Sequence, residues 1–535
     1  MNRHAFAWVS LAFLLTGACQ SATLVLRNGT ILTLDDRLGT VSALAVRDDR
    51  ILAVGDEEAV ARHIGPQTKV IDLGGAFAMP GFIEGHGHFT SLGRSKMILD
   101  LRAVRNWDEV IDKVRAAVAK AHPGEWIVGR GWHQEKWDRP PEKQVEGFPA
   151  HEGVSAVSPD NPVYLTHASG HLCFVNAKAM ALAGIAADTP DPPGGEILRD
   201  DTGQPIGILR ETAQGLVERV YQAQIERSPQ AEKARLRRMI RLADEECLRK
   251  GVTTFEDAGS SFRTIDVMKE MAAAGQIGVR LWVMVHEPND RLREKLDAYR
   301  LIGFADHHLT VRAIKSYIDG ALGSRGAWLL EPYNDAPQSR GLNTVPLEEL
   351  AETARIARAH GFQLCVHAIG DRANREVLNL YEQTFPTRGA LRSARWRIEH
   401  AQHLHPDDIP RFGRLGVIAA MQGIHCTSDA PFVIARLGER RAREGAYAWR
   451  SLIDSGAVVM NGTDTPVEDV APIACFYASV TRKLPDGSRF FPQQCMTRPE
   501  ALRSYTINAA YGAFEEDVKG TLTPGKLADV VVLSR

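Results

Sequence analysis

Eight short runs of buried, β-type residues recur between residues 77 and 462, and this repetition most strongly constrains the fold. Helical patterns separate most of the runs, for example 231–249, 347–360 and 372–383. Strands that alternate with helices indicate a parallel α/β architecture. Eight such units predict a TIM (β/α)8 barrel, whose active site lies at the carboxyl ends of its strands. The runs cover 77–86, 252–256, 280–286, 311–318, 362–367, 396–400, 417–421 and 457–462.

Short β runs with Asn-Gly and Asp-Asp turn signals fill residues 23–76, and residues 513–535 contain one more. A strand-rich segment at each end predicts one small β-sandwich domain built from both termini. The barrel is expected to occupy residues 77–512. Its first two strands are too far apart for one connecting helix. Residues from about 98 to 250 are therefore predicted to be a large insertion at the catalytic face, where such barrels place lids and specificity elements.

The first 22 residues have the pattern of a secretory signal peptide. Arg3 precedes an apolar run from Ala5 to Leu15, and small residues follow through Ala22. The run is shorter than the roughly 20 residues that a bilayer span needs. We expect cleavage near residues 18–22 and export to the periplasm or the medium. Cys19 leaves processing to a lipoprotein, with a lipid anchor, as the alternative.

The charge balance constrains the partners. The formal net charge is −2, and no basic stripe with interleaved aromatic residues is present. This pattern argues against nucleic acid as a partner and leaves a small-molecule substrate as the expected one. The sequence leaves the oligomeric state open, with a homodimer among the alternatives.

Side chains that bind metal ions stand at several predicted strand ends. His86 and His88 end the first run, and residues two apart on a strand point to the same face. Gly85 and Gly87 are expected to leave room for an ion and for substrate. A lone histidine at a strand end is usually structural, but ligand types at matching ends of several strands predict one metal site. The other candidates are Lys315, His367, His400 and Asp464.

Five motifs contain these candidate ligands. They are Pro-Gly-Phe-Ile-Glu-Gly-His-Gly-His at 80–88, Lys-Ser-Tyr-Ile-Asp-Gly at 315–320, Val-His-Ala-Ile-Gly-Asp at 366–371, Arg-Ile-Glu-His-Ala-Gln at 397–402 and Gly-Thr-Asp at 462–464. Together these motifs resemble the amidohydrolase superfamily, within it the branch of amidohydrolase family 3 type that includes N-substituted formamide deformylases. The resemblance covers nearly all of residues 23–534 and is specific for the branch but not for the substrate.

The resemblance implies a metal-dependent hydrolase of a non-peptide C–N bond, in an amide, N-acyl or N-formyl group, that uses a metal-activated hydroxide. It implies two divalent metal ions, with zinc as the expected metal and manganese, iron or nickel as the alternatives. The first would be held by His86, His88 and Asp464, and the second by His367 and His400. Lys315 matches a lysine that is carboxylated and bridges both ions, and Asp464 would also act as the catalytic base. The implied substrate contacts are His171, Asp319, Arg325 and Gln422. The alternatives are an ordinary loop histidine for His171, and holding a lid or forming a structural salt bridge for Asp319 and Arg325.

Two other functions remain open, namely a single-metal deaminase of a cyclic amidine and a catalytically silent binding protein on the same scaffold. Deaminase relatives usually lack the lysine at position 315, and silent derivatives usually lose metal ligands. The chain also departs from the family pattern, with Glu84 where aspartate is usual. At His133 the branch often has an acidic or amide residue.

Overall fold

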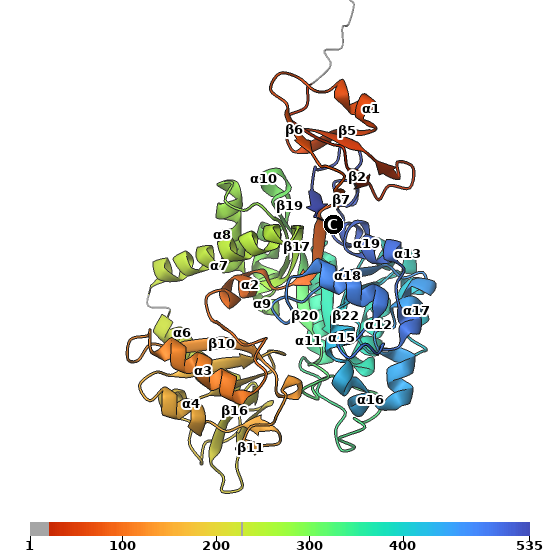
Figure 1. The fold of residues 1–535 in the computed structure, drawn as a ribbon. Helices are drawn as coiled ribbons and strands as arrows, with labels where there is room; N and C mark the ends of the chain where they lie inside the picture. The colour runs from red at the N-terminus through yellow and green to blue at the C-terminus, as the bar shows by residue number, and fades with distance from the viewer. Residues whose placement is uncertain (1–20, 226–227, 535) are drawn as a thin grey trace, which may run out of the picture. The chain divides into compact units, whose positions relative to one another are not determined.

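The computed structural model describes residues 21–225 and 228–534 (Figure 1). The predicted signal peptide, including Cys19, falls outside the described residues except for its last two positions. The chain divides into two compact units, Met1–Pro80 with Asp517–Arg535, and Gly81–Glu516. Over the described ranges, none of the helices combines the length and the apolar character that crossing a membrane requires.

The smaller unit contains two four-stranded sheets, in the orders β5-β4-β1-β6 and β25-β7-β2-β3. Side chains from both sheets, among them Leu26, Ile31 and Leu44, form one hydrophobic cluster. Both ends of the chain contribute, because β25 pairs antiparallel with β7. The bounds are β1 Leu24–Arg27, β2 Thr30–Leu32, β3 Thr40–Val41, β4 Ala43–Arg47, β5 Arg50–Gly55, α1 Glu57–Ala61, β6 Lys69–Asp72, β7 Phe77–Pro80 and β25 Val530–Leu533.

The larger unit is built on eight parallel strands in the order β24-β23-β22-β21-β20-β18-β17-β8. The ring closes where Asp464 N donates to His86 O and His88 N donates to Thr465 O, both at 2.8 Å. The TIM-barrel prediction is confirmed. The strands are β8 Phe82–Gly87, β17 Val252–Ser260, β18 Arg280–Val285, β20 Leu309–Tyr317, β21 Gln363–Ala368, β22 Arg397–His400, β23 Ile418–Gln422 and β24 Val459–Gly462.

Helices pack against these strands, as the spacing of the β runs predicts. α8 (Phe262–Ala273) contacts β20, α11 (Leu347–Ala359) contacts β20 and β21, and α12 (Asp371–Thr384) contacts β21. The remaining barrel elements are α2 Phe89–Ser95, α9 Asn289–Lys295, β19 Leu301–Gly303, α10 Phe304–His307, α13 Arg388–Ala394, α14 Ile409–Leu415, α15 His425–Ser428, α16 Ala430–Gly445, α17 Trp449–Asp454, α18 Pro472–Thr481, α19 Arg498–Ser504 and α20 Ile507–Gly512.

The first predicted run, 77–86, is two strands rather than one. β7 ends at Pro80, β8 begins at Phe82, and Gly81 lies between them. A Cβ atom at position 81 would lie 2.2 Å from Thr253 Oγ1, so only glycine fits there. The apolar pattern continues across the break because both strands are largely buried. Periodicity alone could not reveal the division.

The glycines beside His86 also differ from their predicted role. A Cβ atom at Gly85 would lie 2.5 Å from Asn461 O, and one at Gly87 would lie 2.7 Å from the ring of Phe255. Successive residues of a strand point to opposite faces, so these positions face away from the imidazoles. The glycines therefore let neighbouring segments approach β8 closely, and they do not make room for an ion.

The insertion contains its own six-stranded sheet, in the order β15-β16-β14-β13-β10-β9. Two hydrophobic clusters pack on it, one around Trp107 and Phe174 and the other around Tyr164 and Tyr221. The insertion ends earlier than the predicted position 250, because α7 (Pro229–Arg249) packs against α2 and α8 of the barrel. Its elements are β9 Leu99–Asp100, α3 Trp107–Val118, β10 Ile127–Trp132, β11 Gln144–Val145, β12 Phe148–Pro149, α4 Glu152–Val157, β13 Val163–His167, β14 Leu172–Val175, α5 Ala177–Ala183, β15 Gly195–Arg199, β16 Pro205–Glu211 and α6 Gln214–Ile225.

Candidate metal centre

Three of the predicted ligands form a compact group at the carboxyl ends of the barrel strands. Donor atoms of His86, His400 and Asp464 all lie within 4.8 Å of one another. Asp464 Oδ1 lies 3.5 Å from His86 Nε2 and 3.3 Å from His88 Nε2. His86 and His400 lie on β8 and β22, and Asp464 follows β24 by two residues. Residues far apart in the sequence therefore meet at one point, as the strand-end positions predict.

With His88 counted in this group, two predicted ligands remain, Lys315 and His367, and both lie beside it. The ring centroid of His367, on β21, is 4.5 Å from that of His400 on the neighbouring strand. Lys315 lies on the adjacent strand β20, with Nζ 4.6 Å from the ring centroid of Tyr317, and Tyr317 in turn contacts His367. Lys315 and His367 line the same cavity as His88, His400 and Asp464. All six predicted ligands therefore lie together at the carboxyl ends of the barrel strands.

The donor set fits a divalent metal centre. Among the described residues, His86 Nε2, Lys315 Nζ, His367 Nε2 and Asp464 Oδ1 are buried and lack a hydrogen-bond partner. Unsatisfied buried polar atoms are rare in folded proteins because they cost free energy. A cation held among them would satisfy the imidazole and carboxylate atoms of His86, His367 and Asp464, and both donor types suit zinc and similar ions.

The protonation states of the group also suit metal binding. Burial, and then the neighbouring His400, lower the pKa of His367 well below its ordinary value. The same holds for His400, where burial and then His86 lower the pKa. Burial by itself would raise the pKa of Asp464, but the imidazoles of His86 and His88 hold it well below its ordinary value. Neutral imidazoles and an ionised carboxylate are the forms that coordinate metals.

Two of the candidate ligands have left-handed backbone conformations. The φ angles of His400 and Asp464 are 75° and 55°. Such values are unfavourable for residues with a Cβ atom and are often found at functional sites, where the surrounding structure maintains them. His400 is the last residue of β22, and Asp464 follows the end of β24. At both positions the chain turns the donor atom of the residue toward the shared centre.

A buried ionic cluster, Arg397 with Glu256 and Glu399, supports the metal group from inside the barrel. Glu399 accepts a hydrogen bond from His86 Nδ1, and Arg397 Nε donates to Glu399 Oε1 at 2.7 Å. Arg397 also pairs with Glu256 and donates to Gly85 O at 2.9 Å. Burial by itself would raise the pKa of Glu399, but Arg397 and His86 lower it. Sequence reasoning missed this cluster, although charged residues at alternate positions of a buried strand were a signal.

We expect Glu399→Gln to weaken metal binding about 10- to 100-fold, the usual effect of removing a carboxylate that orients a metal-binding histidine. The amide can still accept a hydrogen bond from His86 but lacks the charge. Competition with a chelator measures the change. Glu444→Gln is the matched control, because Glu444 is exposed and pairs with Arg440 on the surface. An unchanged affinity in Glu399→Gln would show that Glu399 does not position His86.

Three of the predicted substrate contacts, Gln422, Asp319 and Arg325, are engaged with other groups of the protein. Gln422 Oε1 lies 2.8 Å from His400 Nδ1, so it orients that imidazole. Asp319 accepts the backbone N–H groups of Trp328, Ile369 and Gly370, at 2.8–3.0 Å. Arg325 pairs with Asp335 at 3.0 Å. In the described part of the chain, Gln422, Asp319 and Arg325 are absent from the residues that line the cavity over the metal group. The ion pair of Arg325 agrees with the structural alternative for that residue, and substrate contacts at Asp319 and Gln422 stay predictions.

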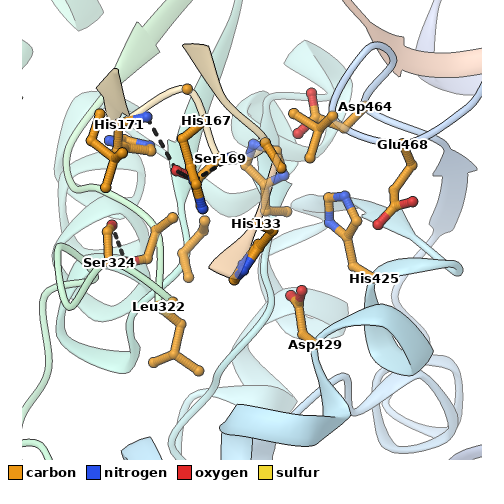
Figure 2. Close-up of a pocket in the computed structure, with 18 of the residues that line it drawn as sticks. His133, His167, Ser169, His171, Leu322, Ser324, His425, Asp429, Asp464 and Glu468 are labelled. Atoms are coloured by element: carbon orange, nitrogen blue, oxygen red, sulfur yellow. Dashed lines mark hydrogen bonds between the residues drawn. The ribbon is translucent and has the colours of Figure 1, made fainter. Parts of the chain in front are cut away.

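The cavity over the metal group has a volume of about 370 Å³. Its outer wall includes His133, His167 and His171 of the insertion, and Figure 2 shows these side chains on one side, with Asp464 and His425 on the other. His171 therefore lies where the sequence predicts a substrate contact, with Nδ1 3.0 Å from Glu211 Oε2. Burial lowers the pKa of His133 to about 3. The imidazole of His133 is thus neutral at physiological pH, as part of a polar wall.

Comparison with known proteins agrees with this geometry. Residues 69–535 match the sequence profile of the Amidohydrolase family. The protein LONG AFTER FAR-RED 3 of Arabidopsis thaliana is 34% identical over 98% of this chain and 90% of its own length. N-substituted formamide deformylase of Arthrobacter pascens is 27% identical over 96% of this chain and 94% of its own length.

The fold is shared as well. The crystal structure of an uncharacterized metal-dependent hydrolase from Pyrococcus horikoshii OT3 matches with a TM-score of 0.77 and 27% identity, over 96% of this chain and 97% of that one. The family expected from the motifs is confirmed. The chain therefore belongs to the amidohydrolase family and is a hydrolase of carbon–nitrogen bonds other than peptide bonds.

Proposed function

We propose that this protein hydrolyses an N-acyl or N-formyl group of a small molecule at a centre of two divalent metal ions. The observation that carries the proposal is the group of four buried donor atoms without partners, at the inner end of a cavity of about 370 Å³. The relative named as a formamide deformylase supports this choice of bond. The proposed ligands are His86, His88, Lys315, His367, His400 and Asp464.

Divalent ions bound here would polarise the substrate carbonyl and lower the pKa of the attacking water. Asp464 Oδ1, which lies beside His86 and His88, would accept the proton of that water and return it to the leaving nitrogen. Gln422 fixes the ring of His400, so that the opposite nitrogen faces the centre. The insertion covers the cavity and limits the access of bulk water.

Lys315 is proposed to be carboxylated on Nζ. Nζ is buried and has no hydrogen-bond partner among the described residues, and it lines the cavity together with His367 and Asp464. An ammonium group would repel a bound cation, whereas a carbamate supplies two anionic oxygens that can bridge two ions. Without the carbamate, a single-metal site and the deaminase reaction would become the expectation.

We expect chelation to abolish hydrolysis of N-formyl and N-acetyl amines and two equivalents of metal per chain to restore it. The reason is that the bound ions would activate the attacking water and polarise the carbonyl of the substrate. Metal analysis of the purified protein, followed by reconstitution with zinc, manganese, iron or nickel, measures both effects. One equivalent with deamination of cyclic amidines would favour the deaminase. Metal loading without any turnover would favour a binding protein.

A further inference from the structure

Arg130 brings an unmatched positive charge to the wall of the cavity. It lies on β10 of the insertion, and its Nη2 donates to Ala168 O at 3.0 Å. Its Nε is buried and has no hydrogen-bond partner. A guanidinium has five N–H donors, and the structure engages one of them. Across residues 21–225 and 228–534, no carboxylate forms an ion pair with Arg130, whose side chain is half-buried.

The surroundings of Arg130 increase the excess of positive charge at this place. Burial lowers the pKa of Arg130 to about 10, so the side chain stays charged at neutral pH, and Arg94 and Arg102 add like charge. Asp464 attracts the guanidinium, but its carboxylate is committed to the metal group. Arg102 is already matched, because it pairs with Asp100 at 2.6 Å and with Asp469 at 3.4 Å. The site is therefore short of one anion beside Arg130.

Apart from Lys315 and Asp464 of the metal centre, the other charged side chains of the cavity wall have partners. Lys136 Nζ lies 3.9 Å from Glu468 Oε1, and Asp429 accepts the hydroxyl of Tyr447 at 2.6 Å. Gly170 lies against the guanidinium, because a Cβ atom there would contact Arg130 Nη1 at 3.7 Å. Arg130 and Gly170 line the same cavity as the metal group. An anion at Arg130 would thus share one cavity with the reacting centre.

We propose that Arg130 binds a carboxylate of the substrate, so that the bond cleaved at the metal centre belongs to an N-acylated amino acid or a similar N-acyl carboxylic acid. The inference rests on the proposed function, because it assumes that the acyl group reaches the metal centre. A planar carboxylate can accept two parallel hydrogen bonds from a guanidinium, which fixes the direction of the substrate as well as its affinity. Arg130 would then select for charge at one end of the cavity, while the metal centre acts at the other.

The test compares matched probes, a series of N-formyl amino acids and their methyl amides, in the wild type and in Arg130→Gln. We expect wild-type kcat/KM for the acids to exceed that for the amides by about 10- to 100-fold, the effect of one charged hydrogen-bonded pair. The ratio should fall to near one in Arg130→Gln and be partly retained in Arg130→Lys. Arg115→Gln is the matched control, because Arg115 also lies in the insertion but is exposed and pairs with Asp112 on the surface, and its ratio should equal that of the wild type.

A binding measurement separates this inference from the proposed function. Calorimetric titration of metal-free wild type and Arg130→Gln with the same probes should show acids binding only to the wild type. Binding of the acids without cleavage by the reconstituted enzyme would support the subsite and reject the hydrolase. Cleavage of acids and amides at equal rates would support the hydrolase and overturn the subsite. Absence of acid binding, or an equal loss in Arg115→Gln, would also overturn the subsite.

Discussion

Lys315→Ala is expected to reduce the metal content from two equivalents per chain to one or fewer. The side chain is buried and lines the cavity beside His367, so its loss removes the proposed bridging ligand. Hydrolysis should fall about 10³-fold, since a lost ion removes several kcal/mol of transition-state stabilisation. Metal analysis and kcat/KM on the same preparations measure the two effects together.

Controls separate a lost ligand from a disturbed barrel. Lys315→Arg keeps a cation that cannot be carboxylated, so it should lose metal as Lys315→Ala does. Lys233→Ala should behave as the wild type, because Lys233 is half-exposed and pairs with Glu270 on the surface. Short carboxylic acids added to Lys315→Ala should restore part of the metal content by occupying the vacated position. One equivalent of metal, unaffected by the substitution, would contradict the carbamate and favour the single-metal deaminase.

Arg397→Met is expected to destabilise the larger unit by about 3–5 kcal/mol, the usual result of removing one partner from a buried ion pair. Arg397, Glu256 and Glu399 are buried at the centre of the barrel. Without the guanidinium, two carboxylates would face each other without a cation. Thermal unfolding of metal-free protein measures the change, so that metal loss does not contribute, and Tm should fall by several degrees.

The interpretation is checked by removing the other charges. A triple variant, Arg397→Met with Glu256→Gln and Glu399→Gln, should recover part of the lost stability, because no uncompensated charge remains. Arg105→Met should leave Tm unchanged within error, since Arg105 pairs with Glu109 on the surface. If Arg397→Met matched this surface control, the cluster would contribute nothing to stability. If the triple variant recovered nothing, lost packing against Trp282 would be the better explanation.

Much of the fold was predictable because its signals are local. Each barrel strand lies on or within a few residues of a predicted run, and His367 and His400 lie at or next to the ends of theirs. A buried run that ends in a metal-binding side chain needs no knowledge of the remaining chain. The shared direction of parallel strands then places these ends at one edge. The division at Gly81 was missed because both strands that it separates are apolar.

The support around the ligands was not predictable from the same signals. Arg397 pairs with Glu256 across 141 positions of sequence, and His86 reaches Glu399 across 313. Gln422, Asp319 and Arg325 stood in the right motifs, yet their hydrogen bonds commit them to His400, to backbone groups and to Asp335. No local pattern distinguishes a polar side chain that faces substrate from one that holds a neighbouring residue.

The sequence by itself determined the barrel, the insertion and the six candidate ligands, because periodicity and residue chemistry are properties of each segment alone. Only the tertiary structure decided which charges are matched. Arg397 is neutralised by two buried carboxylates, whereas Arg130 has no ion-pair partner among the described residues. Pairing depends on which strands become neighbours when the barrel closes and on which insertion residues line the cavity. Those neighbours are set by packing of the whole unit.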